Sequence, residues 1–195
     1  MNQSDPRQER TRQILRDALI ELVAQMPFEA ITITDISQRA RVARKTFYAH
    51  YEDKDALLLD CVAPLLHSLA AGIPNTDVHT LLADNKPLSY PAFKHVQEHA
   101  AFYRALLSEH GSARFIVYLL DFLTRNSYER HQFLWQAAPQ ITVEPMLIAH
   151  FLAGALLNSI RWWLGHDCQP SAETMAYSFS QLAAPGALAA LGLDG

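Results

Sequence analysis

The chain has 195 residues, half of them hydrophobic, and a formal net charge of −4 at pH 7. A chain of this length and make-up is expected to be globular, with one large core or a small domain joined to a larger one. Its first thirty residues are charged throughout and do not resemble a signal peptide, and its longest weakly polar run, residues 145–160, falls short of a membrane span. We therefore expect a cytoplasmic protein that is not bound to a membrane.

The negative charge is unevenly distributed along the chain. Residues 1–55 hold nine basic and nine acidic side chains, whereas the remainder holds seven basic and eleven acidic ones. Within residues 38–54 there are five basic side chains against two acidic ones. The N-terminal part therefore carries a small cationic patch of the kind that a phosphate surface attracts.

The first predicted helix begins at Asp5-Pro6, where a capping side chain precedes a residue that needs no hydrogen-bond partner at that position. It carries an apolar stripe that ends at Pro27 and consists of Ile14, Leu15, Ala18, Leu19, Leu22, Val23 and Met26. The helix is expected to face the core. The arginines at its start, Arg7, Arg10 and Arg12, are either a solvated charged end or the source of one phosphate contact.

A short helix is predicted next, because Ile33, Ile36 and Ala40 repeat at spacings of three and four. Thr32 is placed to cap its first turn, and Asp35 adds a negative charge against the positive end of the helix. Residues 41–43 form a turn, and a second short helix is predicted over residues 44–51. The two helices together have the pattern of a helix-turn-helix.

The second short helix has one apolar side, formed by Phe47 and Tyr51, and one side made of hydrogen-bond donors. A recognition helix presents its N-terminal residues to base edges while its flanks hold phosphates. We therefore predict base contacts from the start of this helix and phosphate contacts from its flanks. The predicted DNA-binding residues are Thr34, Arg44, Lys45, Thr46, Tyr48, His50 and Lys54.

This stretch resembles the TetR family of transcriptional regulators, through ITITDI at residues 31–36, KTFY at 45–48, HY at 50–51 and KDAL at 54–57. Two turn residues depart from the family's pattern. This chain has Arg41 where the family usually has Gly, and Ala43 where the family often has Ser. Arg41 must then accept a conformation that Gly takes without strain.

The resemblance implies an all-α protein with a three-helix DNA-binding domain over residues 1–53 and a helical effector-binding and dimerisation domain over residues 54–195. It also implies a homodimer that binds a palindromic double-stranded operator, an unidentified small-molecule effector, and no cofactor.

The helix that joins the two domains is predicted from Asp53 to Gly72, with Pro64 inside it. A proline there removes one backbone hydrogen bond and is expected to bend or interrupt the helix. Pro64 is either a hinge or a static kink. Irregular chain with a short helix at residues 78–83 follows, and further helices are predicted over residues 89–99, 100–110, 112–138, 142–164 and 171–184.

The last two predicted helices offer more apolar surface than one bundle core should need, together with small residues that permit close helix approach. They are either ordinary core or the interface of a two-fold dimer, and the resemblance favours the dimer. The predicted interface residues are Phe151, Leu152, Ala155, Leu156, Ser159, Trp163 and Phe179.

The middle of the chain is rich in aromatic residues, most of which are expected to be core. The resemblance places an effector pocket here, and apolar pockets with a few polar groups are typical of small-molecule sites. The predicted lining residues are Phe102, Tyr103, Tyr118, Phe122 and Trp162.

An enzyme is the alternative that the sequence leaves open. His95 and His99 belong to an HxxEH pattern, which on a helix is the order of ligands in some zinc peptidases. A zinc-dependent hydrolase would also need a third ligand. No phosphate-binding glycine loop or nucleophile motif is present, and Cys61 and Cys168 lack metal spacing. We therefore predict no catalytic residue and no metal ligand. A helix-turn-helix that binds protein instead of DNA fits poorly with its cationic edge.

Overall fold

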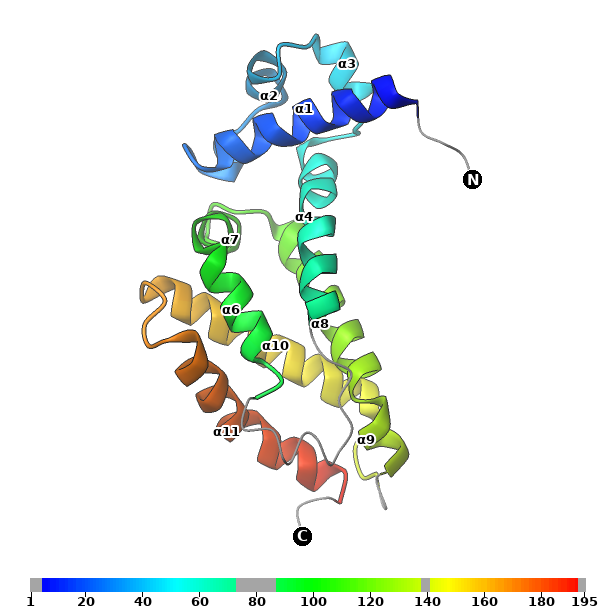
Figure 1. Ribbon diagram of the computed structural model, residues 1–195, viewed down its shortest axis with the longest axis vertical. Coiled ribbons are helices and arrows are strands. Elements are labelled where there is room, and N and C mark those ends of the chain that lie inside the picture. The colour runs from blue at the N-terminus through cyan, green and yellow to red at the C-terminus, as the bar shows by residue number, and fades with distance from the viewer. Residues whose placement is uncertain (1–4, 73–86, 138–140, 193–195) are drawn as a thin grey trace. The chain divides into compact units, whose positions relative to one another are not determined.

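The computed structural model describes residues 5–72, 87–137 and 141–192, and within these ranges all regular structure is helical (Figure 1). The all-α prediction is confirmed; the short helix predicted at residues 78–83 lies outside the described residues. The helices are α1 (Pro6–Val23), the 3-10 turn η1 (Phe28–Ala30), α2 (Ile33–Arg39), α3 (Arg44–Tyr48), α4 (Lys54–Gly72), α6 (Tyr90–Glu98), α7 (Ala100–Leu107), α8 (Ala113–Arg130), α9 (Gln132–Ala137), α10 (Pro145–Gly165) and α11 (Ala172–Ala190).

Most helix ends lie within three residues of the prediction, and two helices differ more. The segment expected to form one helix over residues 112–138 is divided into α8 and α9 at His131, where the sequence has neither Gly nor Pro. Helix α11 was expected to end at Pro185, but it continues to Ala190 with Pro185 inside it. The extension is stabilised by packing: Ala187 and Ala190 lie against a buried cluster that contains Ile148 and Leu191.

The chain forms two compact units. The first unit contains the described residues through His67 together with Ala101–Ile116, and the second contains the rest. Residues 54–67 of α4 thus pack with the helix-turn-helix, so the first unit does not stop at the boundary after residue 53 that the sequence suggested. That boundary stays a prediction about functional domains.

The first unit is built around α1, which packs against α2, while α2 packs against α3 (Figure 1). Leu15, Leu19 and Ile36 are almost completely buried in its core, as are Phe47 and Leu57. The turn between α7 and α8 also belongs to this unit. At Gly111 in that turn, an added Cβ would lie 2.0 Å from the Leu106 carbonyl oxygen, so only glycine fits there.

The second unit is built around α6, α10 and α11, with α6 packed along α11. Phe93 on α6 is fully buried and meets Trp163 of α10 edge to face, with ring centroids 5.5 Å apart. Among the described helices, α10 is long and apolar enough to cross a membrane by length and composition. Buried helices of globular proteins have the same character, and α10 buries Ala149, Ala153 and Trp163 within its own unit.

Candidate DNA-binding surface

The start of α2 is fixed by the predicted cap at Thr32, which forms a reciprocal capping box with Asp35. The Asp35 backbone N–H donates to Thr32 Oγ1 at 3.2 Å, and the Thr32 backbone N–H donates to Asp35 Oδ2 at 2.9 Å. A hydrogen bond from the Thr32 hydroxyl lowers the pKa of Asp35, and so does the one from its backbone. The carboxylate therefore stays ionised beside the positive end of the helix.

The turn after α2 is a Schellman motif. The Arg41 N–H donates to the Gln38 carbonyl at 3.1 Å and the Val42 N–H donates to the Ser37 carbonyl at 2.9 Å. Arg41 occupies the left-handed position with φ of 55°. The turn therefore has the geometry expected with glycine, although an L-residue there costs about 1–2 kcal/mol.

Helix α3 is held by its apolar side and presents its polar side to solvent. Phe47 is fully buried and Tyr51, which follows the helix, is 5% exposed. Arg44 and Lys45 are exposed, and among the described residues neither side chain makes a hydrogen bond or ion pair with the protein. Of the other predicted DNA contacts, Tyr48 is exposed, whereas Thr34, Thr46 and His50 are half-buried.

Lys54 has a different role from the phosphate contact predicted for it. Its ammonium donates to the backbone carbonyls of Phe28 at 2.8 Å, Glu29 at 2.9 Å and Ile31 at 2.8 Å. It also lies 4.7 Å from the centre of the Phe28 ring. An ammonium has only three donors, and all three are used to tie the start of α4 to the turn around η1.

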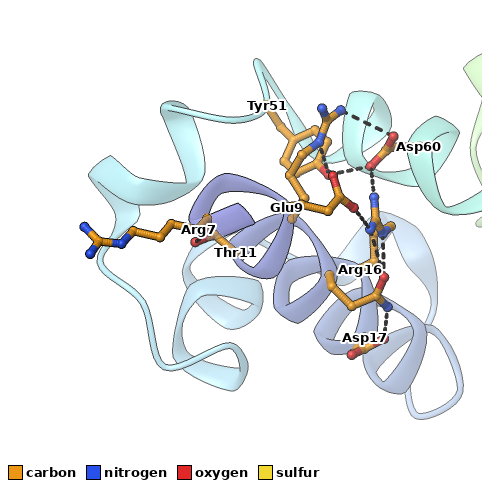
Figure 2. A network of polar contacts seen from close by, with 9 residues as sticks. Arg7, Glu9, Thr11, Arg16, Asp17, Tyr51 and Asp60 are labelled. Carbon is orange, nitrogen blue, oxygen red and sulfur yellow. Dashed lines mark hydrogen bonds and ion pairs between the residues drawn. The ribbon is translucent and has the colours of Figure 1, made fainter. Parts of the chain in front are cut away.

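A polar network joins the end of the helix-turn-helix to α1 and α4 (Figure 2). Asp60 of α4 accepts hydrogen bonds from the Tyr51 hydroxyl at 2.5 Å and from Arg16 Nη1 at 2.8 Å. Arg12 donates to the Tyr51 oxygen at 3.3 Å and lies 3.4 Å from Asp60, while Arg16 also pairs with Glu9. Arg12 is thus a member of this network, which fixes Tyr51 directly after α3.

The network changes the ionisation of its members. Burial acts to raise the pKa of Asp60, but the hydrogen bonds from Tyr51 and Arg16 and the nearby arginine charges lower it below its ordinary value. Burial, followed by the hydrogen bond to Asp60, raises the pKa of Tyr51 to about 12. At neutral pH the network therefore contains an ionised carboxylate, a neutral phenol and two guanidinium groups.

Asp60 was not singled out in the sequence, although a signal was present. It is the only charged residue in the apolar run from Ala56 to Leu66. A charge in such a run is expected to have a partner, because burying an unpaired carboxylate is costly. The identity of its partners could not be read, since Arg12 and Arg16 lie more than forty positions away along the chain.

The residues predicted to line an effector pocket are divided between the two units. Phe102 and Tyr103 belong to the first unit, where Tyr103 is 1% exposed, and the other three belong to the second. Tyr118 and Phe122 are half-buried on α8. Trp162 is 52% exposed and stacks on His166 at 4.1 Å between ring centroids. Its exposure places it on the outer face of α10.

The predicted dimer-interface residues are also divided. Trp163 is fully buried within its own unit and is therefore not available to a partner subunit, whereas Phe179 packs on Phe93 and is half-buried. Leu152 packs against the cluster around Ile148. Phe151 is 61% exposed, and Ala155, Leu156 and Ser159 are half-buried. Two large apolar side chains outside the predicted set are at least as exposed as Phe151: Leu147 at 61% and Leu182 at 84%.

The HxxEH pattern does not form a metal centre in the described part of the chain. The His95 and His99 rings lie 4.8 Å apart between centroids. Burial, and after it the charge of His99, lowers the pKa of His95. Among the described residues no three His, Cys, Asp or Glu side chains are grouped closely enough to hold a metal ion. The zinc-hydrolase alternative has no support.

A capped helix, a Schellman turn and a short helix with an exposed cationic start, followed by helical bundle, define a DNA-binding transcriptional regulator of the helix-turn-helix class. Residues 15–61 match the model described as bacterial regulatory proteins of the tetR family, and residues 86–184 match a transcriptional regulator C-terminal region of TetR type. The chain belongs to the TetR family of transcriptional regulators.

A curated relative is an uncharacterised HTH-type transcriptional regulator, YxbF, of Bacillus subtilis (strain 168), with 23% identity over 172 residues. The match covers 86% of this chain but 43% of that protein, so this chain spans less than half of the relative's length.

Solved structures share the fold. A TetR regulator from Streptococcus agalactiae 2603V superposes with a TM-score of 0.66 at 22% identity, covering 91% of this chain and 95% of that one. Thermus thermophilus FadR, a TetR-family repressor in complex with lauroyl-CoA, superposes with a TM-score of 0.62 at 22% identity, and the match covers 90% of this chain and 94% of FadR. The dihydroxyacetone kinase operon activator DhaS superposes with a TM-score of 0.59 at 17% identity, and the match covers 90% of this chain and 95% of DhaS.

Proposed function

We propose that this chain is a ligand-responsive repressor that binds a palindromic operator as a homodimer, with α3 in the major groove. The observation that carries the proposal is the start of α3. Arg44 and Lys45 are exposed there and make no hydrogen bond or ion pair with the described protein, while buried Phe47 fixes the helix beneath them. Side chains held in this way suit base edges, because Arg and Lys pair with guanine in the major groove.

The roles of the surrounding residues follow from their positions. Arg44, Lys45 and Thr46 face base edges, and Tyr48 and His50 on the same short segment hold phosphates. Thr34 assists from α2. Lys54 is left out of this surface, because its ammonium donors already serve three backbone carbonyls.

The exposed apolar faces of α10 and α11 support the homodimer. Leu147, Phe151 and Trp162 lie on α10 at spacings of four and eleven residues, which follow one face of a helix, and each is at least half exposed. Leu182 on α11 is 84% exposed. An apolar surface of this kind is typical of an association site. A two-fold interface would present two copies of α3 to half-sites about 34–36 Å apart.

The response to an effector rests on thermodynamic linkage. An effector that binds better to a dimer whose two α3 helices cannot reach both half-sites weakens DNA binding. DNA weakens effector binding by the same factor, and the coupling free energy is typically about 1–3 kcal/mol. The FadR structure contains lauroyl-CoA, whose acyl chain is apolar, and we propose that the effector here has an apolar part, with Tyr118 and Phe122 among its contacts. Pro64, inside the continuous helix α4, is the proposed hinge.

The test begins with an operator selected from a library of random duplexes or from the DNA upstream of the gene. Arg44→Ala should relax the preference at one operator position by about 1–3 kcal/mol, or roughly 5- to 150-fold, because it removes a base contact. Arg125→Ala removes an exposed charge from α8 in the second unit and is the matched control. The proposed docking of α3 is wrong if Arg44→Ala and Arg125→Ala bind all sequences alike.

The dimer is tested separately by sedimentation equilibrium. Phe151→Glu and Leu182→Glu should give monomers that no longer bind the operator. Val117→Glu is the control. The Val117 side chain is 60% exposed, nearly the same fraction as Phe151, but it lies on α8 and not on the proposed interface. Monomeric wild-type protein would contradict the homodimer, and a transcription assay with and without the operator would distinguish a repressor from an activator.

A further inference from the structure

We infer that Arg41, in the turn between α2 and α3, is a DNA contact of this protein: its guanidinium binds a backbone phosphate at the edge of the groove that α3 enters. The inference rests on the proposed docking of α3. It adds a residue of the turn, three positions before the start of the recognition helix, that the predicted DNA-binding set did not contain.

The backbone at Arg41 gives no reason for an arginine. Its φ of 55° lies in the left-handed region, which glycine adopts without strain. The turn is closed by hydrogen bonds from the backbone N–H groups of Arg41 and Val42. Any residue except proline can make the Arg41 bond, so the side chain adds nothing to the turn and its Cβ introduces strain.

The side chain at Arg41 has no role inside the described protein either. It is exposed, and it makes no hydrogen bond or ion pair with the described residues. Neighbouring Arg39 behaves differently: its guanidinium donates to Glu21 at 2.9 Å and to Gln25 at 3.0 Å. A strained position that keeps a long, unpartnered cation indicates a function outside the fold.

The five cations of residues 38–54 therefore separate into two groups. Arg39 and Lys54 are used within the protein, whereas Arg41, Arg44 and Lys45 remain available within five consecutive residues. These three are the basic side chains of residues 38–54 that make no hydrogen bond or ion pair with the described protein.

The position of Arg41 in the chain points to phosphate and not to a base. Arg44 and Lys45 start the recognition helix, whose first turn faces the bases. The turn that leads into that helix must cross the edge of the groove, where the phosphates lie. Arginine suits this place, because its planar guanidinium pairs with phosphate through two parallel hydrogen bonds.

The test uses the full-length protein with two duplexes, the selected operator and an unrelated sequence, over a series of salt concentrations. Arg41→Gly removes the charge and the strain together, Arg41→Asn removes the charge but tolerates the left-handed backbone, and Arg41→Lys keeps a charge. Arg125→Ala controls for the loss of one charge elsewhere, and Arg44→Ala reports on the docking of α3.

We expect Arg41→Gly to raise the midpoint of thermal unfolding by a few degrees, yet to weaken both duplexes by a similar factor, several-fold at moderate salt. The slope of log affinity against log salt should fall by about 0.9 per subunit, as for one lost phosphate contact. Arg41→Asn should lose the same affinity, and Arg41→Lys should keep most of the slope. A gain in stability with a loss of affinity cannot result from damage to the fold.

The inference is overturned if Arg41→Gly and Arg41→Asn keep the wild-type affinity and salt slope while Arg44→Ala loses operator preference. It is also overturned if Arg41→Gly weakens only the operator, since a phosphate contact acts on both duplexes. If Arg44→Ala is without effect as well, the docking of α3 fails, and the inference fails with it.

Discussion

Both compact units have a buried apolar core, but they differ in the contacts that join elements far apart in the chain. In the first unit, charged side chains join elements far apart in the chain: Arg16 with Asp60, Lys54 with the carbonyls around η1, and Arg114 with Asp53 at 3.0 Å. In the second unit, α6, α10 and α11 are joined through aromatic contacts such as Phe93 with Trp163. Directional contacts of this kind hold the elements around α3 in one arrangement, whereas apolar packing alone places fewer angular constraints on the helices of the second unit.

The largest expected effect is in the second unit. Phe93→Ala should destabilise the protein by about 3–5 kcal/mol, because it removes a fully buried ring and leaves a cavity beside Trp163 and Phe179. Urea denaturation followed by tryptophan fluorescence measures this loss, which should depend little on salt. Val117→Ala, at a side chain that is 60% exposed, should cost little. Equal losses for the two variants would contradict a core built on Phe93.

The corresponding change in the first unit is Asp60→Asn. It should cost about 2–3 kcal/mol, since hydrogen bonds to a charged group are lost and Arg16 keeps its charge with only one of its two carboxylate partners, Glu9. DNA affinity should fall as well, because Tyr51 lies three residues beyond the end of α3 and its ring packs on Phe47 of that helix. Asp17→Asn is the control: that carboxylate is exposed and accepts a bond from Gln13. If both variants behave alike, the network does not fix α3.

Lys54 and Lys45 provide a sharper comparison within the first unit. Lys54→Met should cost about 2 kcal/mol of stability through the loss of charge-assisted bonds to three carbonyls. Lys45→Met should leave stability nearly unchanged but weaken DNA binding. Thermal unfolding and DNA titration of both variants check this. A Lys54→Met variant that keeps its stability but binds DNA more weakly would show that Lys54 contacts DNA after all.

A smaller effect is expected from acid. The folded protein lowers the pKa of Asp60 below its ordinary value of 3.8, chiefly through Tyr51 and Arg16 acting against burial. The resulting stability is present above pH 3.8 and is lost as the pH falls toward the lowered pKa. The difference in unfolding free energy between wild type and Asp60→Asn should therefore shrink below that pH. A difference that stays constant would show that the negative charge of Asp60 does not contribute to the stability of the network.

The smallest expected effect is a gain. Ala43 has the extended backbone of a helix N-cap but supplies no side-chain hydrogen bond to α3. Ala43→Ser should stabilise the protein by about 0.5–1 kcal/mol by accepting a bond from the first turn. A thermal unfolding midpoint that rises by a few degrees would agree with this, and an unchanged midpoint would show that the first turn of α3 does not gain from a cap.

The helix-turn-helix could be predicted because its signals are local. The cap at Thr32 lies three residues from Asp35, and Ile36 and Phe47 are the buried positions that the apolar spacing indicates. The carbonyl partners of Lys54 and the arginine partners of Asp60 could not be predicted, because these contacts join residues 23 to 48 positions apart. Sequence periodicity contains no information about such pairs.

The second unit shows a different limit. Trp162 and Trp163 are adjacent, yet one is 52% exposed and the other fully buried. Apolar residues occur on most sides of α10, so its pattern does not indicate which side is the core. The continuation of α11 beyond Pro185 has a similar cause, since the packing of Ala187 and Ala190 outweighs the backbone hydrogen bond that proline removes.

The inclusion of Ala101–Ile116 in the first unit has a consequence for protein engineering. Ser112 donates to Asp55, and His110 lies 3.3 Å from Glu29, so this later segment completes the surroundings of the N-terminal helices. A chimera that grafts the N-terminal residues onto another regulator would leave behind part of the scaffold of its DNA-reading head. The graft should contain both segments of the first unit, residues through His67 and Ala101–Ile116. During synthesis, the first unit cannot complete its folding until the second of these segments has left the ribosome.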